Sequence, residues 1–309
     1  MANAITLFKQ YVSMLDEVYK LSSLTSDLDG ASDLARQGAN ANELIIPKLS
    51  MQGLADYSRN GGYIDGDVTL TNESVRCNFD RGRMFTVDTL DNAETAGLAF
   101  GRLAGEFIRT KVVPELDAFR FAAYAQTTGI STVTGAALST GAGVVEAIRA
   151  AINKMDEDEV PQEQRYLYIT PTLLGLVEDL DTTKSKKVLE GFAKITKVPQ
   201  SRFYTKIAQK SGKIITTGEG QDASTTDESA GGYACAALLF PTWAPLPPLN
   251  FMVIHKPALI QYQKHTVPKV ITPEQNQTAD AWKFGYRTVG IADAYENKVA
   301  GIYLHKSTT

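Results

Sequence analysis

The sequence has few of the residues from which catalytic and metal centres are usually built. It contains two cysteines and three histidines among 309 residues. Cys77 and Cys235 are too few and too far apart in the chain for a disulfide framework or a zinc site. His255, His265 and His305 stand in no metal-ligand or catalytic-triad context, so we interpret them as structural. We therefore predict no catalytic residue, no cofactor and no metal ligand.

The sequence also lacks a membrane-spanning run and a signal peptide. It has no stretch of about eighteen uninterrupted apolar residues. Residues 1–9 have neither the charged start nor the apolar core of a signal peptide. We expect a protein that is made and retained in a cytosol, or released without the secretory route, and that has no membrane partner.

Two further motifs do not predict a ligand site. The segment Gly141-Ala142-Gly143 lacks a third glycine at the required offset and does not follow a strand, which argues against a dinucleotide-binding loop. The acidic run 156–159 precedes Pro161 at the end of a helical pattern, which is typical of a solvated loop. A cytosolic α+β enzyme stays open as an alternative, because spacing alone cannot assemble a catalytic set.

The composition is that of an ordinary globular protein with a small excess of acidic residues. The chain is 43% hydrophobic and 21% charged, and its formal net charge is −4. Such a chain can bury one large or two modest cores. It lacks the basic footprint of a protein that binds nucleic acid regardless of sequence.

Charge is segregated in the second half of the chain. Residues 146–181 carry nine acids against three bases, and residues 184–213 carry nine bases against one acid. Two solvated faces explain this pattern, and so do complementary edges that meet across a head-to-tail subunit interface. Phosphate binding by the basic run is a third explanation. The interface hypothesis makes Lys184, Lys186 and Lys187 candidate contact residues.

The first ninety residues predict a helix, an arm and a hairpin. Residues 5–24 have the apolar spacing of an amphipathic helix. Residues 25–42 are rich in Ser, Asp, Gly and Asn, and predict an extended arm outside the core. A short strand is expected at 44–49.

We interpret the rest of the chain around the stretch 60–125, which opens with a ribbon. Apolar residues occupy alternate positions between Val75 and Val87. This pattern predicts a two-stranded hairpin that turns at residues 80–83. A two-stranded ribbon with one thin apolar stripe is marginal in water by itself, so we expect a neighbouring subunit to cover it. The candidate contact residues here are Arg76, Asp80, Arg81, Arg83, Phe85 and Asp88.

Residues 91–126 predict a long amphipathic helix with a kink or break at Pro114. Proline removes a backbone hydrogen bond and costs about 3 kcal/mol in an undistorted helix. Gly97, Gly101 and Gly105 recur at every fourth position. We interpret this glycine stripe as a surface for close packing on a sheet.

From about residue 130 the pattern alternates between strand and helix. Residues 127–143, mostly Thr, Gly, Ser and Ala, predict a flexible joint. The later elements predicted are helices at 144–155 and 170–180, a strand at 165–169, a long polar loop at 211–232, and strands near 286–292 and 299–305. The fold class is therefore α+β.

Several of these stretches resemble the major capsid proteins of tailed bacteriophages. The resemblance is carried, in order, by YIDGDVTL (63–70), DRGRMFTVD (80–88), GEFIRTKVVPE (105–115), YITP (168–171), VPQSRFYT (198–205), NFMVIHK (250–256) and ENKVAGIYLH (296–305). It covers residues 44–309.

The resemblance implies the tailed-phage major capsid fold, which encapsulins share. Its parts, carried over by position, would be an N-terminal arm at 1–43, an extended β-hairpin loop at 44–91, a peripheral domain with a long spine helix at 92–129, an axial domain at 130–248, and return strands of the peripheral domain at 249–309.

The resemblance also implies a structural, non-enzymatic function. The chain would self-assemble into hexamers and pentamers of an icosahedral shell that encloses double-stranded phage DNA. It would be assembled in the host bacterial cytoplasm and would reside in the virion, with a portal protein as a partner. The alternative on the same fold is an encapsulin-like protein compartment.

Two departures from the family pattern refine these expectations. Some members of the fold join subunits by an isopeptide bond from a lysine in the extended loop, but no lysine occurs between Lys48 and Lys111. We therefore expect non-covalent shells. Other members carry a removable scaffolding segment before the arm, whereas this arm begins close to Met1. A separate scaffolding protein is accordingly expected.

Overall fold

The computed structural model describes residues 23–30, 36–37, 43–90, 98–135, 138–217, 224–235 and 247–308. Its helical elements used below are η1 (Ser26–Leu28), α3 (Leu98–Phe107), the π-helical η3 (Ile108–Val112), α4 (Val113–Ala125), α5 (Gly141–Glu157), α6 (Pro171–Glu178), α7 (Thr183–Glu190) and η4 (Gln200–Arg202). The helix expected at 5–24 falls largely outside the described residues.

The strands of the described residues form five sheets. Their bounds are β1 (Arg36–Gln37), β2 (Glu43–Met51), β3 (Val68–Arg76), β4 (Phe79–Asp88), β5 (Ser131–Gly135), β6 (Arg165–Ile169), β7 (Lys194–Lys197), β8 (Ala208–Gln209), β9 (Ile214–Thr217), β10 (Ser224–Asp227), β11 (Tyr233–Ala234), β12 (Leu249–His255), β13 (Leu259–Ile271), β14 (Ala281–Ala294) and β15 (Ile302–Ser307). The sheet orders are β1-β2-β3, β10-β9, β11-β8, β5-β15-β12-β6-β7 and β13-β14-β4. This mixture of helices and sheets confirms the predicted α+β class.

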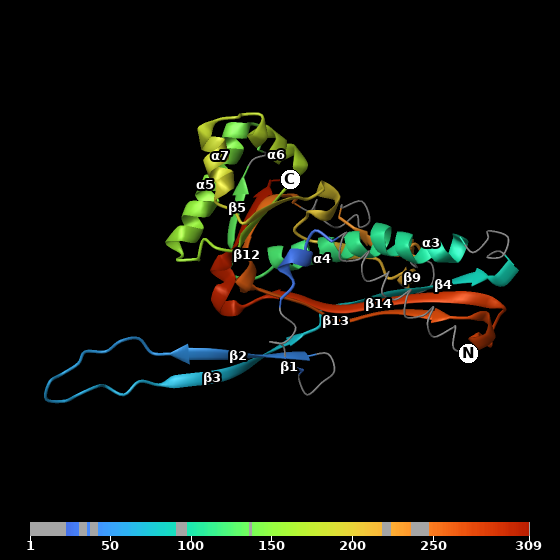
Figure 1. Cartoon of the computed structure of the whole chain (residues 1–309), viewed down its shortest axis with the longest axis horizontal. Helices are drawn as coiled ribbons and strands as arrows, with labels where there is room; N and C mark the ends of the chain where they lie inside the picture. The colour runs from blue at the N-terminus through green and yellow to red at the C-terminus, as the bar shows by residue number, and fades with distance from the viewer. Residues whose placement is uncertain are drawn as a thin grey trace.

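The five-stranded sheet is covered on both faces, which accounts for the almost continuous apolar sequence of β12. Phe251 and Val253 pack with side chains of α5, α6 and α7 on one face. Met252 and Ile254 pack on the other face with α4 and η1. Residues alternate between the faces of a strand, so a strand buried on both sides needs apolar residues throughout. Figure 1 shows α5–α7 grouped over this sheet.

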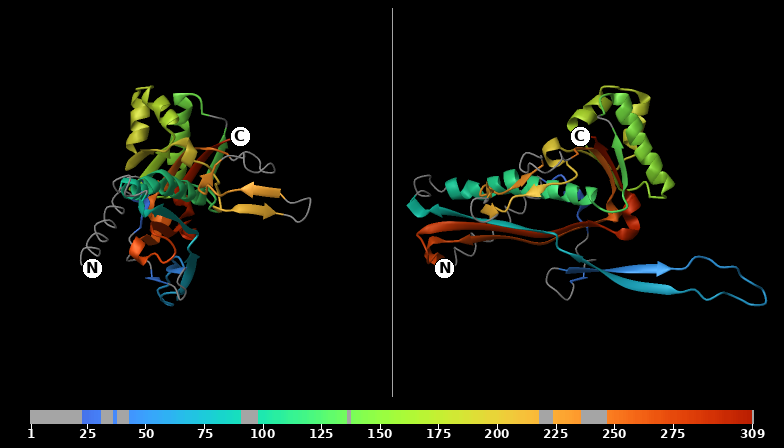
Figure 2. Two further views of the ribbon diagram at one scale, coloured as in Figure 1. Left: turned by 90° about the vertical axis from the view of Figure 1, so that its right-hand side faces the viewer. Right: turned by 180° about the vertical axis from the view of Figure 1, so that it is seen from behind.

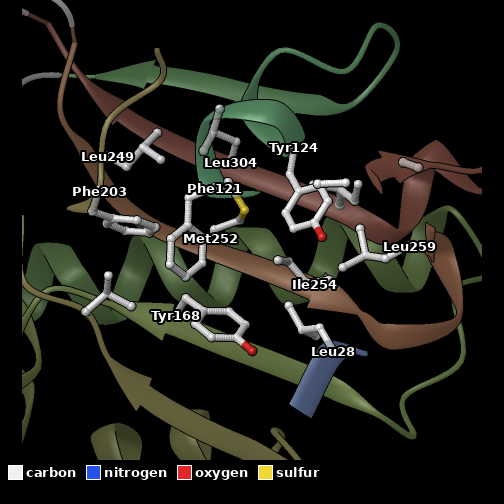
Figure 3. Packing of buried hydrophobic residues seen from close by; sticks show 14 residues of the cluster. Leu28, Phe121, Tyr124, Tyr168, Phe203, Leu249, Met252, Ile254, Leu259 and Leu304 are labelled. Carbon is white, nitrogen blue, oxygen red and sulfur yellow. The ribbon is translucent and has the colours of Figure 1, made fainter. Parts of the chain in front are cut away.

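Phe121 and Tyr124 of α4 join the five-stranded sheet to the rest of the molecule. Phe121 makes edge-to-face contacts with Tyr168 and Phe203, with ring centroids 5.2 and 5.0 Å apart. These side chains, with Met252, form the core in Figure 3. Aromatic pairs in this geometry stabilise a core by about 0.5–1.5 kcal/mol beyond their buried area.

The long sheet β13-β14-β4 carries the long helix, residues 98–125, along one face (Figure 1). Phe79 of β4 and Phe284 of β14 are buried against Ile108 and Leu116 of the helix. Exposure alternates along much of β4, which confirms that the apolar residues at alternate positions share one face of the strand. The turn expected at residues 80–83 is wrong, because β4 runs through them and pairs with β14. Gly82 is a strand residue, and a Cβ added there would lie 2.8 Å from the Tyr286 carbonyl oxygen.

The long helix stays helical across Pro114. Val112 and Val113 keep right-handed helical backbone angles, and the turn before the proline is π-helical. A π turn shifts the hydrogen-bond pattern by one residue, which accommodates a residue without an N–H. The expected irregularity is therefore a π segment and not a break. The close-packing interpretation is wrong at Gly105, where an added Cβ would meet nothing within 4 Å.

The extended hairpin consists of β2, β3 and the connecting residues 52–67. Its strands pair in register from Glu43↔Arg76 to Met51↔Val68. Figures 1 and 2 show it projecting well beyond the body of the molecule. A hairpin within the loop expected at 44–91 is present, but its two strands are β2 and β3, while β4 belongs to the long sheet.

Three other segments differ from expectation. Residues 25–30, expected in an arm outside the core, include the buried Thr25 and Leu28. The expected joint at 127–143 contains β5, which pairs in parallel with β15. The expected polar loop at 211–232 contains the antiparallel pair β9–β10, seen as a second projecting ribbon in Figure 2. The sequences of β5, β9 and β10 are rich in Thr and Ser and were interpreted as loops, although Thr is a good strand former.

The remaining predicted elements are confirmed. β6 spans the predicted 165–169, α5 contains the predicted 144–155, and α6 begins with Thr170 as N-cap and Pro171 as its first residue. β14 and β15 contain most of the two strands expected near the C-terminal end.

Candidate functional site

The extended hairpin carries more than half of the large apolar side chains that are exposed in the described residues. Of the fifteen large hydrophobic side chains that are exposed in the described residues, eight lie on it: Leu49, Met51, Leu54, Tyr57, Tyr63, Ile64, Val68 and Leu70. A contiguous exposed group of this kind on a soluble protein marks an interaction surface. In the outer half of the hairpin, residues 52–67, every residue is exposed except the half-buried Gly62.

The tip of the hairpin has local structure of its own. Ser58 and Gly62 form an antiparallel bridge, and the Ser58 hydroxyl accepts a hydrogen bond from the Gly61 N–H at 2.8 Å. Gly62 adopts φ +74°, a conformation that glycine reaches without steric cost. The Tyr57 and Tyr63 rings lie 4.9 Å apart. The tip therefore presents its aromatic side chains in a defined arrangement.

A second feature is the groove, a depression of about 870 Å³ between the long helix, β4 and the segments 210–212 and 230–233. Four of the predicted contact residues, Asp80, Arg81, Arg83 and Phe85, line it. Its apolar part includes Phe107, whose ring lies edge-on to Phe85 at 4.8 Å. The structure thus brings these four residues to one surface.

Arg81 and Arg83 fasten the segment 229–232 to β4. Arg83 donates hydrogen bonds to the carbonyl oxygens of Ser229 and Ala230 at 3.0 and 3.1 Å. Arg81 donates to the Gly232 carbonyl oxygen at 3.2 Å. Gly231 has φ +65°, and an added Cβ there would lie 2.7 Å from Arg83 Nη1. A glycine at 231 therefore permits the segment to lie against Arg83.

Glu115 lies below this contact and pairs with Arg81, whose Nε is 2.8 Å from Glu115 Oε1. Only 10% of the Glu115 side chain is exposed. Burial raises the pKa of Glu115, an effect that the charge and the hydrogen bond of Arg81 oppose. Nothing in the sequence spacing indicated this pair, because the two residues come from a strand and a helix 34 positions apart.

Of the other hairpin-region candidates, Asp80 lines the groove, whereas Asp88 and Arg76 are not among its lining residues. Asp80 pairs with Arg287 of β14, with Arg287 Nη2 2.6 Å from Asp80 Oδ2. Asp88 accepts a hydrogen bond from the Leu90 N–H, which caps the end of β4. Arg76 is exposed at the base of the extended hairpin, at the end of β3.

The three candidate lysines lie on α7, far along the chain from the groove segments. Lys186 pairs with Asp181 at 2.6 Å, and Lys184 and Lys187 are exposed. The basic and acidic runs also meet within the chain, since Lys197 Nζ lies 3.6 Å from Glu178. Part of the segregated charge is thus neutralised inside one subunit.

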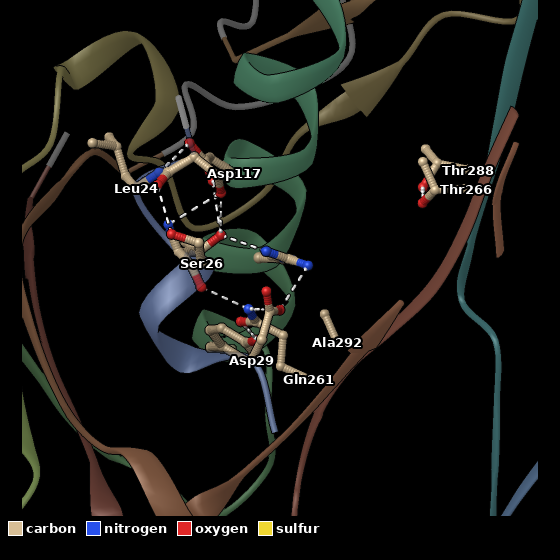
Figure 4. A network of polar contacts seen from close by, with 12 residues as sticks. Leu24, Ser26, Asp29, Asp117, Gln261, Thr266, Thr288 and Ala292 are labelled. Atoms are coloured by element: carbon tan, nitrogen blue, oxygen red, sulfur yellow. Dashed lines mark hydrogen bonds and ion pairs between the residues drawn. The ribbon is translucent and has the colours of Figure 1, made fainter. Parts of the chain in front are cut away.

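A buried polar network holds residues 23–30, here called the arm anchor, against α4 (Figure 4). The fully buried Asp117 carboxylate accepts hydrogen bonds from the Ser23 and Thr25 hydroxyls and from the Leu24 N–H. Arg120 and Gln261 donate to Thr25 and to Asp29 of the same segment. Sequence reasoning missed this network, whose sequence signal is the pair of charged residues Asp117 and Arg120 among the apolar residues of α4.

His255 and Cys235 are partly buried, and His305 is buried. His305 stacks on Phe251 with ring centroids 5.2 Å apart, and burial lowers its pKa. His255 also has a lowered pKa because of burial. Burial raises the pKa of Cys235 to about 12, which leaves a weakly nucleophilic thiol. The side chain of His265 lies outside the part of the chain that is described.

The described residues also bear on metal binding and on membrane insertion. They contain no group of three or more His, Cys, Asp and Glu that could hold a metal ion. Among them, no helix has both the length and the apolarity needed to cross a membrane.

Comparison with known proteins places the fold. No family model and no curated protein matches the sequence. Solved structures match over almost the whole chain. A virus-like particle from Pyrococcus furiosus aligns with a TM-score of 0.58 at 10% identity, covering 97% of this chain and 99% of that one.

Phage capsids align as well. The capsid of Staphylococcus phage Andhra aligns with a TM-score of 0.54 at 11% identity, covering 91% of this chain and 83% of that one. The mature capsid of bacteriophage PhiM1 aligns with a TM-score of 0.52 at 12% identity, covering 87% and 82%. The chain has the tailed-phage capsid fold. This confirms the fold that the resemblance implied.

The capsid fold gives the exposed hairpin a structural context. The described chain reproduces the fold over nearly its full length, so the hairpin is an integral part of the subunit and not an appended domain. Lys48 is the lysine of this hairpin and lies in β2, where it pairs with Glu296 of the same chain at 2.7 Å.

Proposed function

We propose that this chain is the major capsid protein of a tailed bacteriophage, a structural protein that forms hexamers and pentamers of an icosahedral shell around double-stranded DNA. The observation that carries the proposal is the extended hairpin, which exposes eight large apolar side chains in a fold shared with capsid structures. Burying each such side chain fully is favourable by about 1.5–3 kcal/mol. A neighbouring subunit is the surface that provides this burial.

The hairpin also favours ring-shaped assemblies. It projects from one end of an elongated body, so the surface that it offers differs from the surface that would receive it (Figure 1). Contacts between unlike surfaces repeat from copy to copy, and they form a closed ring when the rotation between copies closes. Hexamers and pentamers are such rings.

The proposed function involves no catalysis. Burial lowers the pKa of His255 and of His305 and raises the pKa of Cys235 to about 12, which supports a structural role for these three side chains. The net charge of −4 suits a container. Strong phosphate affinity would oppose both the packing and the release of DNA.

The exposed lysines of α7 provide a second contact surface between subunits. Lys184 and Lys187 are exposed and make no ion pair among the described residues, so they are available to acids on a neighbouring subunit. Exposed pairs of this kind fix the register of an interface more than they strengthen it, with about 0.2–1 kcal/mol each. Lys186, already paired with Asp181, contributes less.

The proposal includes the partners that the fold implies. These are a separate scaffolding protein, a portal protein and packaged DNA, with assembly in the host bacterial cytoplasm and residence in the virion. Subunits are joined without covalent bonds, because the hairpin beyond Lys48 has no lysine for an isopeptide bond.

A second candidate is a compartment of the encapsulin type that holds a cargo protein. The alignment with the Pyrococcus furiosus virus-like particle favours it, since that match covers 97% of this chain. The two candidates share the shell and differ in its contents.

Expression of the chain with and without its genomic neighbours, followed by negative-stain microscopy, tests the proposal. Closed shells that contain nuclease-protected DNA in the presence of the neighbours support the phage capsid. Shells that contain a co-purifying protein and no nucleic acid support the compartment. A chain that stays a small oligomer under every condition contradicts both.

A further inference from the structure

Asn60 is the one asparagine of the chain that is followed by a glycine. In such a pair the glycine nitrogen can attack the side-chain amide carbon of the asparagine and close a five-membered ring. Glycine favours this attack, because it has no Cβ and reaches backbone conformations that other residues rarely adopt. The pair Asn60-Gly61 therefore has the composition of a site where asparagine loses its amide group spontaneously.

The structure places this pair where water and base have free access. Asn60 and Gly61 are both exposed and lie in the turn that the bridge between Ser58 and Gly62 closes. The Asn60 side chain makes no hydrogen bond among the described residues. Asn78 provides a contrast, since its side chain is held by two hydrogen bonds to the backbone of β14. The Asn60 amide is free to rotate toward the backbone, and the Asn78 amide is not.

One hydrogen bond opposes the reaction. The Gly61 N–H donates to the Ser58 hydroxyl oxygen at 2.8 Å. The Gly61 nitrogen can attack only after its proton is removed, and a hydrogen-bonded amide proton is protected from base. This bond is itself exposed, so local fluctuations of the turn open it. Ser58 therefore slows the reaction and does not prevent it.

We propose that Asn60 deamidates spontaneously in the unassembled subunit, at a rate limited by the hydrogen bond between Gly61 and Ser58. The Gly61 nitrogen loses its proton to base and forms a bond to the Asn60 side-chain carbon. The bond from that carbon to the amide nitrogen breaks, and ammonia leaves with a proton taken from water. A second water molecule opens the cyclic imide at either carbonyl carbon, which gives aspartate or isoaspartate. No oxidant or reductant is required.

Both products alter the hairpin tip. Each adds one negative charge to residues 52–67, which already contain three aspartates and a single arginine. Isoaspartate also inserts one additional carbon into the backbone of the turn. A longer loop cannot keep the register of the Ser58–Gly62 bridge, which holds Tyr57 and Tyr63 close together. The modified tip therefore loses its defined arrangement of aromatic side chains.

The consequence for assembly is the one step that rests on the proposed function. A subunit whose hairpin tip has changed shape and charge fits a shell less well than an unmodified one. Shells should therefore take up unmodified chains, and modified chains should accumulate among the free subunits. Deamidation of Asn60 thus limits the time during which a free subunit can assemble.

Mass spectrometry of the unassembled chain tests the chemistry. Chymotryptic cleavage after Tyr57 and Tyr63 gives the peptide 58–63, in which Asn60 is the single amide side chain and no aspartate occurs. With time this peptide should gain the mass that accompanies conversion of an amide to an acid, and should separate into aspartate and isoaspartate forms. The rate should rise from neutral to mildly alkaline pH, because the Gly61 nitrogen must lose its proton. A peptide that stays unmodified after prolonged incubation overturns the proposal.

Two substitutions test the parts of the reaction. Asn60→Gln keeps the amide group but would have to close a six-membered ring, so its peptide should stay unmodified. Ser58→Ala removes the acceptor of the Gly61 N–H and should accelerate both deamidation and amide hydrogen exchange at Gly61 by about fivefold. A Ser58→Ala chain that deamidates no faster than the wild-type chain overturns the assignment of Ser58 as the rate-limiting restraint.

The step that concerns assembly has a separate measurement. Free subunits are aged, assembly is then started, and particles and remaining free subunits are analysed at once. The isoaspartate content of peptide 58–63 should be several-fold lower in the particles. Equal contents in the two fractions contradict the exclusion of modified chains, while deamidation and the proposed function both stand. If no particles form under any condition, the proposed function fails, and the mass spectrometry of the free chain still decides the chemistry.

Discussion

The Thr25 hydroxyl donates a hydrogen bond to the Asp117 carboxylate at 2.7 Å across 92 positions of sequence, and both residues are fully buried. This bond is the centre of the polar network that holds the arm anchor against α4. A carboxylate in such a position stabilises the fold only while its hydrogen bonds are made, because an unpaired buried charge is costly.

We predict that Asp117→Ala releases residues 23–30 from the body of the subunit. Three donors in the segment and Arg202 lose their common acceptor, at a cost of about 3 kcal/mol. Amide hydrogen exchange in residues 24–30 should accelerate by about a hundredfold. Asp27→Ala in the same segment is the matched control. Its ion pair with Lys194 lies at the surface, so exchange should change little. Equal acceleration in both variants would contradict this account of the arm anchor.

A second prediction concerns Gly231 and Gly232, which both have positive φ. Gly231→Ala should destabilise the segment more than Gly232→Ala, because only the Cβ at 231 meets Arg83. The backbone strain of about 1 kcal/mol is common to both, while the hydrogen bonds of Arg83 are worth about 1–2 kcal/mol more. Limited proteolysis within 211–232 measures the difference. It should disappear in an Arg83→Ala background, and its persistence there would exclude the steric cause.

Glu115 predicts a pH dependence with a defined sign. Its pKa is raised in the folded chain by burial, so the folded state retains this proton at pH values where the unfolded state has lost it. Stability therefore falls as the pH rises from the ordinary value of 4.5 through the raised value, and is constant above it. Glu115→Gln should remove this dependence.

The wild-type and Glu115→Gln chains are best compared as unassembled protein. A variant with charged residues introduced at the hairpin tip, which should not assemble, provides such a background. Urea titration gives the difference in unfolding free energy between the wild-type chain and the Glu115→Gln variant. This difference should shift in favour of the wild-type chain as the pH falls from about 7 to about 4.5. A shift in the opposite direction would mean that the Arg81 ion pair outweighs burial.

The hairpin tip yields a prediction that separates folding from assembly. Leu54→Glu with Ile64→Glu should abolish particles and leave the melting temperature of the subunit unchanged within error, because both side chains are exposed and touch no core. Sedimentation velocity and circular dichroism give the two readings. Leu90→Glu, also exposed but outside the hairpin, is the control and should still assemble. A lowered melting temperature would show that the tip packs on its own chain.

The spacing of apolar residues along the sequence predicted those helices and strands whose buried residues recur at regular intervals. β6, α5 and α6 have buried faces set by residues close in sequence, and caps such as Thr170-Pro171 mark their ends. A covering neighbour was expected for a ribbon at residues 75–87, and this expectation failed there because β4 pairs with β14 in the long sheet.

What pattern could not predict depends on contacts between distant segments. Gly82 has the sequence context of a turn, yet it is a strand glycine required by the approach of Tyr286 from β14, which is far away in the sequence. Residues 25–30 had the composition of a solvated arm, because their partners Asp117, Arg120 and Gln261 come from other elements. The groove was predicted only in part, through Asp80, Arg81, Arg83 and Phe85, because its opposite wall is distant in sequence.

Hydroxyl-radical footprinting of Tyr63 in assembled and unassembled protein tests the central claim most directly. The Tyr63 side chain is 88% exposed in the isolated subunit, so it should react readily there. In purified particles we predict that Tyr63 is protected, because a neighbouring subunit covers the hairpin. Particles in which Tyr63 reacts as fast as in the free subunit would contradict assembly through the hairpin.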